Sequence, residues 1–175
     1  MRETRIRSFA PVAARNAKVL ILGSIPGRAS LAAGQYYAHR QNAFWGIVCR
    51  LLAIDPASPY PARIRALRTS RIALWDVLNS CVRPGSLDSR IERETANDFT
   101  AFFRRHPDIA HVFFNGAKAE ASFRRHVLSS VQRPLRYARL PSTSPAHASA
   151  PFERKLEAWR AILGGIIPGI PRGGR

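Results

Sequence analysis

The chain has 175 residues, with 28 lysines and arginines against 11 aspartates and glutamates, a formal net charge of +17 at pH 7 and an isoelectric point near 11.6. Such an excess attracts polyanions, and because an arginine-rich codon bias would not explain the scarcity of acids, we expect nucleic acid as the partner. No apolar run approaches the ~20 residues of a membrane span, and the basic N-terminus has no apolar stretch typical of a secretory signal, so we expect a cytoplasmic protein without membrane association.

The length suits one domain with its own hydrophobic core. We predict a single domain over residues 17–165, preceded by a basic arm at 1–16 and followed by a flexible Gly/Pro-rich tail at 166–175. Such a domain needs no second subunit, so a monomer is expected. Cys49 and Cys81 lie in unrelated segments without CxxC spacing, which predicts buried free thiols and argues against a metal site or a disulfide.

Short apolar runs alternate with helical patterns along the chain. Strands are predicted at 18–22, 71–77, 111–115 and 136–140, the last one weaker and partly alternating. Helices are predicted at 43–54, 97–106, 116–128 and 151–163, where apolar residues recur at helical spacing. This alternation predicts an α/β fold with a parallel sheet and helices on both of its faces.

In a parallel sheet, ligands bind beyond the carboxyl ends of the strands. Small polar or turn-forming residues stand at the predicted ends: Gly23–Gly27, Asp76 and Asn79, Asn115–Gly116, and the loop 141–147. The first of these, "GSIPG", comprises Gly23, Ser24, Ile25, Pro26 and Gly27. Its glycines would let a ligand approach the main chain, although an ordinary turn explains them equally well. It lacks the GK[ST] of a phosphate-binding P-loop and is not GxGxxG.

Two asparagines lie on this edge, and each has two possible roles. Asn42 directly precedes one predicted helix and Asn115 another, so both suit a helix N-cap. A carboxamide in a pocket would instead hold a water through its carbonyl or donate to a base. Because an amide cannot act as a general base, a reaction that it serves must need little proton abstraction.

Further candidates surround the asparagines. Tyr36 and Tyr37 could both be core aromatics. Alternatively, Tyr37 could provide a flat ring on which a nucleobase stacks. His39 is either an exposed loop residue or a contact to phosphate or base. Ser142, Thr143 and Ser144, followed by His147, form either an ordinary loop or a set of donors to DNA phosphates.

The segments "LGSIPGRASLAAGQYYAHRQNAFW", "FFNGAKAEASF" and "LPSTSPA" resemble the uracil-DNA glycosylase superfamily, and most of all its hypoxanthine-DNA glycosylase branch. The resemblance runs from about Val19 to Trp159. It implies a three-layer α/β/α sandwich around a four-stranded parallel sheet. It also implies excision of a base from DNA without metal or cofactor.

The resemblance carries over residue by residue, with one departure. Related mismatch-specific glycosylases have a catalytic asparagine within a Gly-x-Asn-Pro-Gly turn, and other branches use an acid nearby. The matching residue in this chain is Ile25, which can neither hold nor activate water. The branch implicates the asparagine before "FW", which matches Asn42, and a second one matching Asn115. Tyr37 matches the aromatic that stacks on the base.

These residues permit a dissociative hydrolysis of the N-glycosidic bond. Main-chain N–H groups of Ser24 and Ile25 with the Asn115 amide would stabilise the departing base, while Asn42 would position water. We expect uracil and hypoxanthine, and by the same carbonyl pattern xanthine, as substrates in DNA that contains deaminated bases.

Two rival interpretations remain open at this point. One is a non-catalytic binder of damaged or single-stranded DNA. The other is an enzyme of free nucleotides that uses "GSIPG" as a phosphate cradle, which the net charge disfavours. An endonuclease would need clustered acids for Mg²⁺, which the sequence lacks.

Overall fold

The computed structural model describes residues 5–83 and 90–166, so residues 1–4 of the predicted arm and 167–175 of the predicted tail lie outside it. At its centre is a four-stranded sheet in the order β3-β2-β6-β7, and all of its strand pairs are parallel. The strands are β2 (Val19–Gly23), β3 (Ile72–Asp76), β6 (His111–Asn115) and β7 (Arg136–Leu140). The predicted parallel sheet is confirmed, with bounds within one or two residues of those expected.

The sheet separates two hydrophobic clusters, one on each face. The interior strand β2 is therefore buried on both faces. In β2, Leu20 and Leu22 contribute to one cluster, whereas Val19 and Ile21 contribute to the other. This alternation follows from the two-residue period of a strand, in which successive side chains point to opposite faces. A continuous apolar run is therefore required in β2, and "VLIL" provides it.

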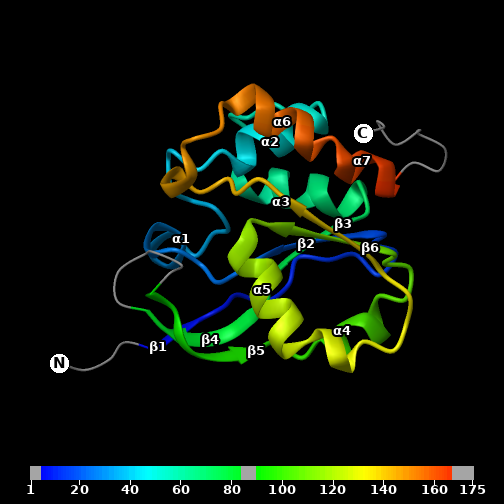
Figure 1. The fold of residues 1–175 in the computed structure, drawn as a ribbon. Helices are drawn as coiled ribbons and strands as arrows, with labels where there is room; N and C mark the ends of the chain where they lie inside the picture. Colours follow the sequence, from blue (N-terminus) through cyan, green and yellow to red (C-terminus); the bar gives the residue numbers. More distant parts are fainter. Residues whose placement is uncertain (1–4, 84–89, 167–175) are drawn as a thin grey trace.

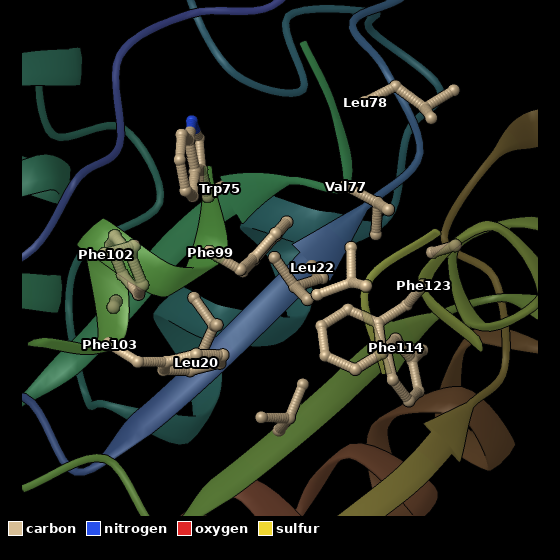
Figure 2. Packing of buried hydrophobic residues seen from close by; sticks show 14 of the residues in the cluster. Leu20, Leu22, Trp75, Val77, Leu78, Phe99, Phe102, Phe103, Phe114 and Phe123 are labelled. Atoms are coloured by element: carbon tan, nitrogen blue, oxygen red, sulfur yellow. The ribbon is translucent and has the colours of Figure 1, made fainter. Parts of the chain in front are cut away.

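Helices cover both faces, which confirms the three-layer α/β/α arrangement (Figure 1). One layer contains α2 (Phe44–Leu51), α3 (Tyr60–Thr69), α6 (Phe152–Trp159) and α7 (Ala161–Ile166). The opposite layer contains α4 (Phe99–Arg105) and α5 (Ala117–His126). Figure 2 shows the aromatic character of that second layer, where Phe99 and Phe102 pack on Trp75 and Phe123 packs on Phe114.

A second, antiparallel sheet was not predicted. It has the order β1-β4-β5 and comprises β1 (Arg5–Arg7), β4 (Leu78–Val82) and β5 (Glu92–Ala96). Part of the segment expected as a basic arm is thus a strand, with Ile6 facing Cys81. Its hydrophobic side chains Ile6, Leu78 and Cys81 join the cluster under the parallel sheet.

A short helix α1 (Arg28–Ala33) and the helix α3 are also additions to the predicted elements. α1 ends at Gly34, whose positive φ of 62° suits a residue without a β-carbon. Both cysteines are buried and free, as expected. In the two described ranges, no helix is both long and apolar enough to cross a membrane.

Candidate active site

A cavity of about 330 Å³ opens at the carboxyl ends of the parallel strands, which is a size typical of small-ligand sites. It gathers segments that are far apart in the sequence. Most predicted site residues line it, namely Gly23, Ser24, Ile25, Pro26, Gly27, Tyr37, His39, Asn42, Asn115, Ser142, Thr143 and Ser144. His147 is not among the lining residues, and neither is Asn79, which lies exposed in β4.

The turn Gly23–Gly27 forms one wall and is tied to the start of β4. The carbonyls of Gly23 and Ser24 accept hydrogen bonds from the N–H groups of Val77 and Leu78, at 2.9 and 3.0 Å. A β-carbon at position 23 would lie 2.7 Å from Asp76 Oδ1 and 2.8 Å from the Tyr37 hydroxyl. Only glycine therefore allows the carboxylate and the phenol to come this close to the turn.

Ile25 belongs to the hydrophobic cluster beneath the sheet and is 6% exposed. The position that the resemblance matches to a catalytic asparagine is thus used here for packing. The Ile25 side chain offers no polar group, so this residue can contribute only its main chain to polar chemistry in the pocket.

Arg83 is a pocket residue that the sequence analysis missed. Its guanidinium is almost fully buried, and Nη2 donates to the Pro26 carbonyl at 2.7 Å. Arginine is seldom this buried without a specific partner. Arg83 therefore fixes the Gly23–Gly27 turn from the side of β4 and also provides a positive charge to the cavity.

Asp76 ends β3 on the same wall and is 3% exposed. Its Oδ2 accepts a hydrogen bond from Ser8 at 3.1 Å, and its main-chain carbonyl accepts one from Asn97 at 2.8 Å. Burial raises the pKa of the neighbouring Tyr36 phenol far above its ordinary value, and the negative charge of Asp76 raises it further. Tyr36 is therefore neutral and, at 4% exposure, a core aromatic.

Asn42 lines the cavity and also bonds to the first turn of α2, so its position is compatible with both of the roles that the sequence left as alternatives. Its Oδ1 accepts a hydrogen bond from the Phe44 N–H at 3.0 Å, which satisfies one donor of the first turn of α2. The side chain is half-buried and lines the cavity. Since a carbonyl oxygen has two lone pairs, this contact leaves one acceptor site for a water.

Asn115 ends β6 and does not cap the following helix, because Gly116 is the N-cap of α5 and no side chain bonds there. Instead, Asn115 holds the loop 141–147. Its Nδ2 donates to Thr143 Oγ1 at 2.9 Å, and the Thr143 N–H donates to its Oδ1 at 2.9 Å. Thr143 also accepts from the Ala43 N–H at 3.0 Å. One residue thus connects the end of β6 to the entrance of α2.

Thr143 is only 1% exposed, and its hydroxyl, N–H and carbonyl all have protein partners. This geometry gives Thr143 a structural part in the loop. Ser142 and Ser144 are half-buried beside it, and each accepts a local hydrogen bond from the main chain. His147 is exposed, and its carbonyl accepts from Lys155 at 2.8 Å.

Tyr37 lines the cavity and stacks on the buried Phe44, with ring centroids 4.0 Å apart and planes inclined by 19°. Its φ of 54° lies in the left-handed region, which is uncommon for a non-glycine residue. His39 is exposed at the rim, where its Nδ1 accepts from the Gln41 N–H at 3.2 Å.

The cavity therefore combines neutral carboxamides, main-chain groups, the buried cation of Arg83, the buried carboxylate of Asp76 and an aromatic ring. Such a set can bind a flat heterocycle by stacking and hydrogen bonding and can stabilise negative charge on it. Among the residues that the structure describes, no group of three or more His, Cys, Asp or Glu side chains is placed to hold a metal ion.

Comparisons with known proteins agree with this geometry. Residues 10–163 match the family model of the uracil DNA glycosylase superfamily. The chain is 38% identical to the hypoxanthine DNA glycosylase of Methanosarcina barkeri over 114 residues, which are 65% of this chain and 72% of the relative. It is 33% identical to the hypoxanthine DNA glycosylase of Methanosarcina acetivorans over 160 residues, or 90% and 97% of the two proteins.

A solved structure shows the same fold. The solution structure of a candidate uracil DNA glycosylase from Methanosarcina acetivorans superposes with a TM-score of 0.78 at 32% identity. The superposition covers 91% of this chain and 96% of that protein.

Proposed function

The chain belongs to the uracil DNA glycosylase superfamily, and we propose that it hydrolyses the N-glycosidic bond of deaminated nucleotides in DNA and so initiates base excision repair. The observation that carries this proposal is the meeting of Asn42, Asn115 and Tyr37 with the Gly23–Gly27 turn around one base-sized cavity. These groups come from three separate segments, and the fold brings them to the carboxyl ends of the sheet.

The first step is the binding of a nucleotide that has been flipped out of the duplex. A base inside a stack cannot reach a cavity at this depth, so it must enter from the surface with its sugar at the rim. Tyr37, held from behind by Phe44, is the ring on which the base stacks. Ser142 and Ser144 are assigned to the DNA backbone together with His39 and His147, whereas Thr143 is assigned to holding the loop.

The bond then breaks as the base departs with negative charge and the sugar becomes an oxocarbenium-like cation. The side-chain amide of Asn115 has two N–H groups, and one of them bonds to Thr143. We assign the other N–H to the departing base, together with the main-chain N–H groups of Ser24 and Ile25. The buried guanidinium of Arg83 lowers the energy of an anion in the same cavity.

Water captures the sugar cation in the last step, and the proton that this water loses neutralises the departed base anion. The second lone pair of Asn42 Oδ1 is the group assigned to orient this water, because the first is used by Phe44. An amide suffices here, since an oxocarbenium-like cation needs a well-placed nucleophile more than a strong base. Asp76 is engaged with Ser8 behind the turn, so we assign it to positioning the turn.

Both named relatives act on hypoxanthine, and we extend this substrate to the chain with uracil and xanthine beside it. Each of these bases has a carbonyl where the parent base had an amine. An amide N–H can therefore bond to the new carbonyl, whereas the amine that stood at the same position of the parent base offers it no acceptor.

The test is base release from matched oligonucleotides that contain uracil, hypoxanthine or xanthine, in single and double strands, with undamaged DNA as the control. We expect free base and an alkali-labile abasic site. Tight binding without any release would identify a non-catalytic damage binder instead. Release from free nucleotides but not from DNA would contradict the proposed substrate class.

A further inference from the structure

A second hollow, of about 760 Å³, lies against the base cavity on the side of α2 and α6. We call it the side groove. The two share a wall that consists of Tyr37, His39, Asn42, Thr143, Ser144 and Pro145. A DNA strand with one nucleotide in the cavity would therefore bring its next nucleotide to the mouth of the side groove.

The charge of the side groove suits a nucleotide. Arg40, Arg63 and Lys155 line it, and no aspartate or glutamate is among its lining residues. The Arg63 guanidinium lies 4.7 Å from the ring centroid of Trp45 and 5.7 Å from that of Tyr60. Its Nε is buried without a hydrogen-bond partner in the part of the chain that the structure describes. Packing on the Trp45 and Tyr60 rings thus holds the Arg63 guanidinium in place, and no acidic residue in the described ranges is paired with it.

The side groove also carries an unusual aromatic side chain. Phe152, at the start of α6, is 37% exposed, more than any other large hydrophobic side chain in the described ranges. Its ring rests on α2 where Gly46 leaves room, since a β-carbon there would lie 3.2 Å from Phe152 Cε2. An exposed ring that is fixed on one side can stack on a base with the other.

We propose that the side groove binds the nucleotide next to the extruded one on the same strand, with its base on Phe152 and its phosphate beside Arg40 and Arg63. This inference rests on the proposed function, because it assumes that the neighbouring cavity holds a base of DNA. The side groove is then a second subsite, which binds an unpaired nucleotide on one side of the lesion whatever the damaged base is.

The experiment measures the dissociation constant for short single strands that carry one lesion nucleotide and one to three neighbours on either the 5′ or the 3′ side. A non-cleavable sugar, such as a 2′-fluoro nucleotide at the lesion, separates binding from base release. For the wild-type chain, we expect the first neighbour on one side to tighten binding on the order of tenfold, and the first neighbour on the other side to add much less.

Three variants assign this gain to the side groove. Phe152→Ala is expected to lose most of the tenfold gain, and Phe152→Trp to keep it, because a ring remains. Arg63→Met, which keeps the packing on Trp45, is expected to weaken binding and to reduce the salt dependence by about one counterion. Arg65→Met removes the same charge from an exposed position of α3 outside the side groove and is the matched control.

The outcomes separate the two proposals. An unchanged one-sided gain in Phe152→Ala, or a gain that appears only with a complementary strand, would overturn the side-groove assignment even if base release is efficient. Conversely, a chain that releases no base but shows the one-sided gain and its loss in Phe152→Ala would overturn the glycosylase mechanism and support the subsite.

Discussion

Asn115 and Thr143 form two hydrogen bonds of 2.9 Å at the carboxyl end of the sheet. The side-chain Nδ2 of Asn115 donates to the Thr143 hydroxyl, and the Thr143 main-chain N–H donates to the side-chain Oδ1 of Asn115. The residue assigned to the departing base is therefore also the residue that fixes the loop over the cavity. Base recognition and loop position depend on the same side chain.

Asn115→Ala is expected to weaken both functions. The variant leaves the buried N–H and hydroxyl of Thr143 without partners, which costs about 1–3 kcal/mol of folding free energy. Urea unfolding measures this cost, and single-turnover base release measures the catalytic part. Thr143→Val is the matched control, since it loses the hydroxyl bond but keeps Asn115. A release rate as low in Thr143→Val as in Asn115→Ala would assign the whole effect to the loop.

Asn42→Ala is expected to lower single-turnover base release by about a hundredfold or more, as for other preorganised groups, with little change in affinity for damaged DNA. The variant also loses the bond to the Phe44 N–H, which costs about 1 kcal/mol of stability. Asn42→Ser separates the two effects because serine is a good helix cap with a shorter reach. We expect near wild-type unfolding and slow release; rapid release by this variant would reduce Asn42 to a cap.

Arg83→Met is expected to slow base release by at least tenfold and to loosen the Gly23–Gly27 turn. The substitution removes the buried positive charge and the 2.7 Å bond to the Pro26 carbonyl. Arg83→Lys restores a charge but not the planar donor geometry, so it should recover part of the rate. Single-turnover kinetics over both variants provide the measurement, and a wild-type rate in Arg83→Met would show that the charge has no part in the reaction.

Glu94→Gln is expected to destabilise the fold at neutral pH and much less in acid. Burial raises the pKa of Glu94, but hydrogen bonds from Lys118, Ser122 and His126 outweigh it, and the pKa lies below its ordinary value. A lowered folded-state pKa stabilises the protein above the unfolded-state pKa, and this stabilisation is lost as the pH falls through the folded-state value.

The measurement for Glu94→Gln is urea unfolding at several pH values. The stability difference from wild type should be largest near neutral pH and shrink towards zero as the carboxyl is protonated. Glu153→Gln is a suitable control, since its pair with Arg50 is exposed and is worth about 0–1 kcal/mol. A Glu94 effect that does not change with pH would indicate lost packing, not lost charge.

The parallel sheet could be predicted because β2, β3 and the centre of β6 are buried on both faces, so "VLIL" of β2 and "VFF" of β6 had to be continuous apolar runs. The edge strand β7 is largely exposed and left only a weaker pattern. The antiparallel sheet left no such pattern. β5 reads "ERETA" with no fully buried residue, and β1 has three residues, so their pairing with β4 depends on contacts between distant segments.

The candidate site likewise contains residues that could be predicted from the sequence and residues that could not. Asn42, Asn115 and the Gly23–Gly27 turn follow predicted strands or precede predicted helices, so their common edge could be inferred from element order alone. Arg83 could not, because its burial arises from a contact with Pro26, 57 positions earlier, and an arginine in a basic chain is ordinarily exposed. The burial of Thr143 is likewise a result of tertiary contacts that the sequence does not display.

The packing of Ile25 has a consequence for how such an enzyme can diverge. Its side chain is part of the hydrophobic layer, so placing an amide or acid at this position would bury a polar group and impair folding before any new chemistry arose. Asn42 sits in a half-exposed loop, where exchanges are far less costly to the fold. Selection can therefore adjust the placement of the attacking water, the role proposed for Asn42, while position 25 is retained for folding stability, so the two properties can evolve independently.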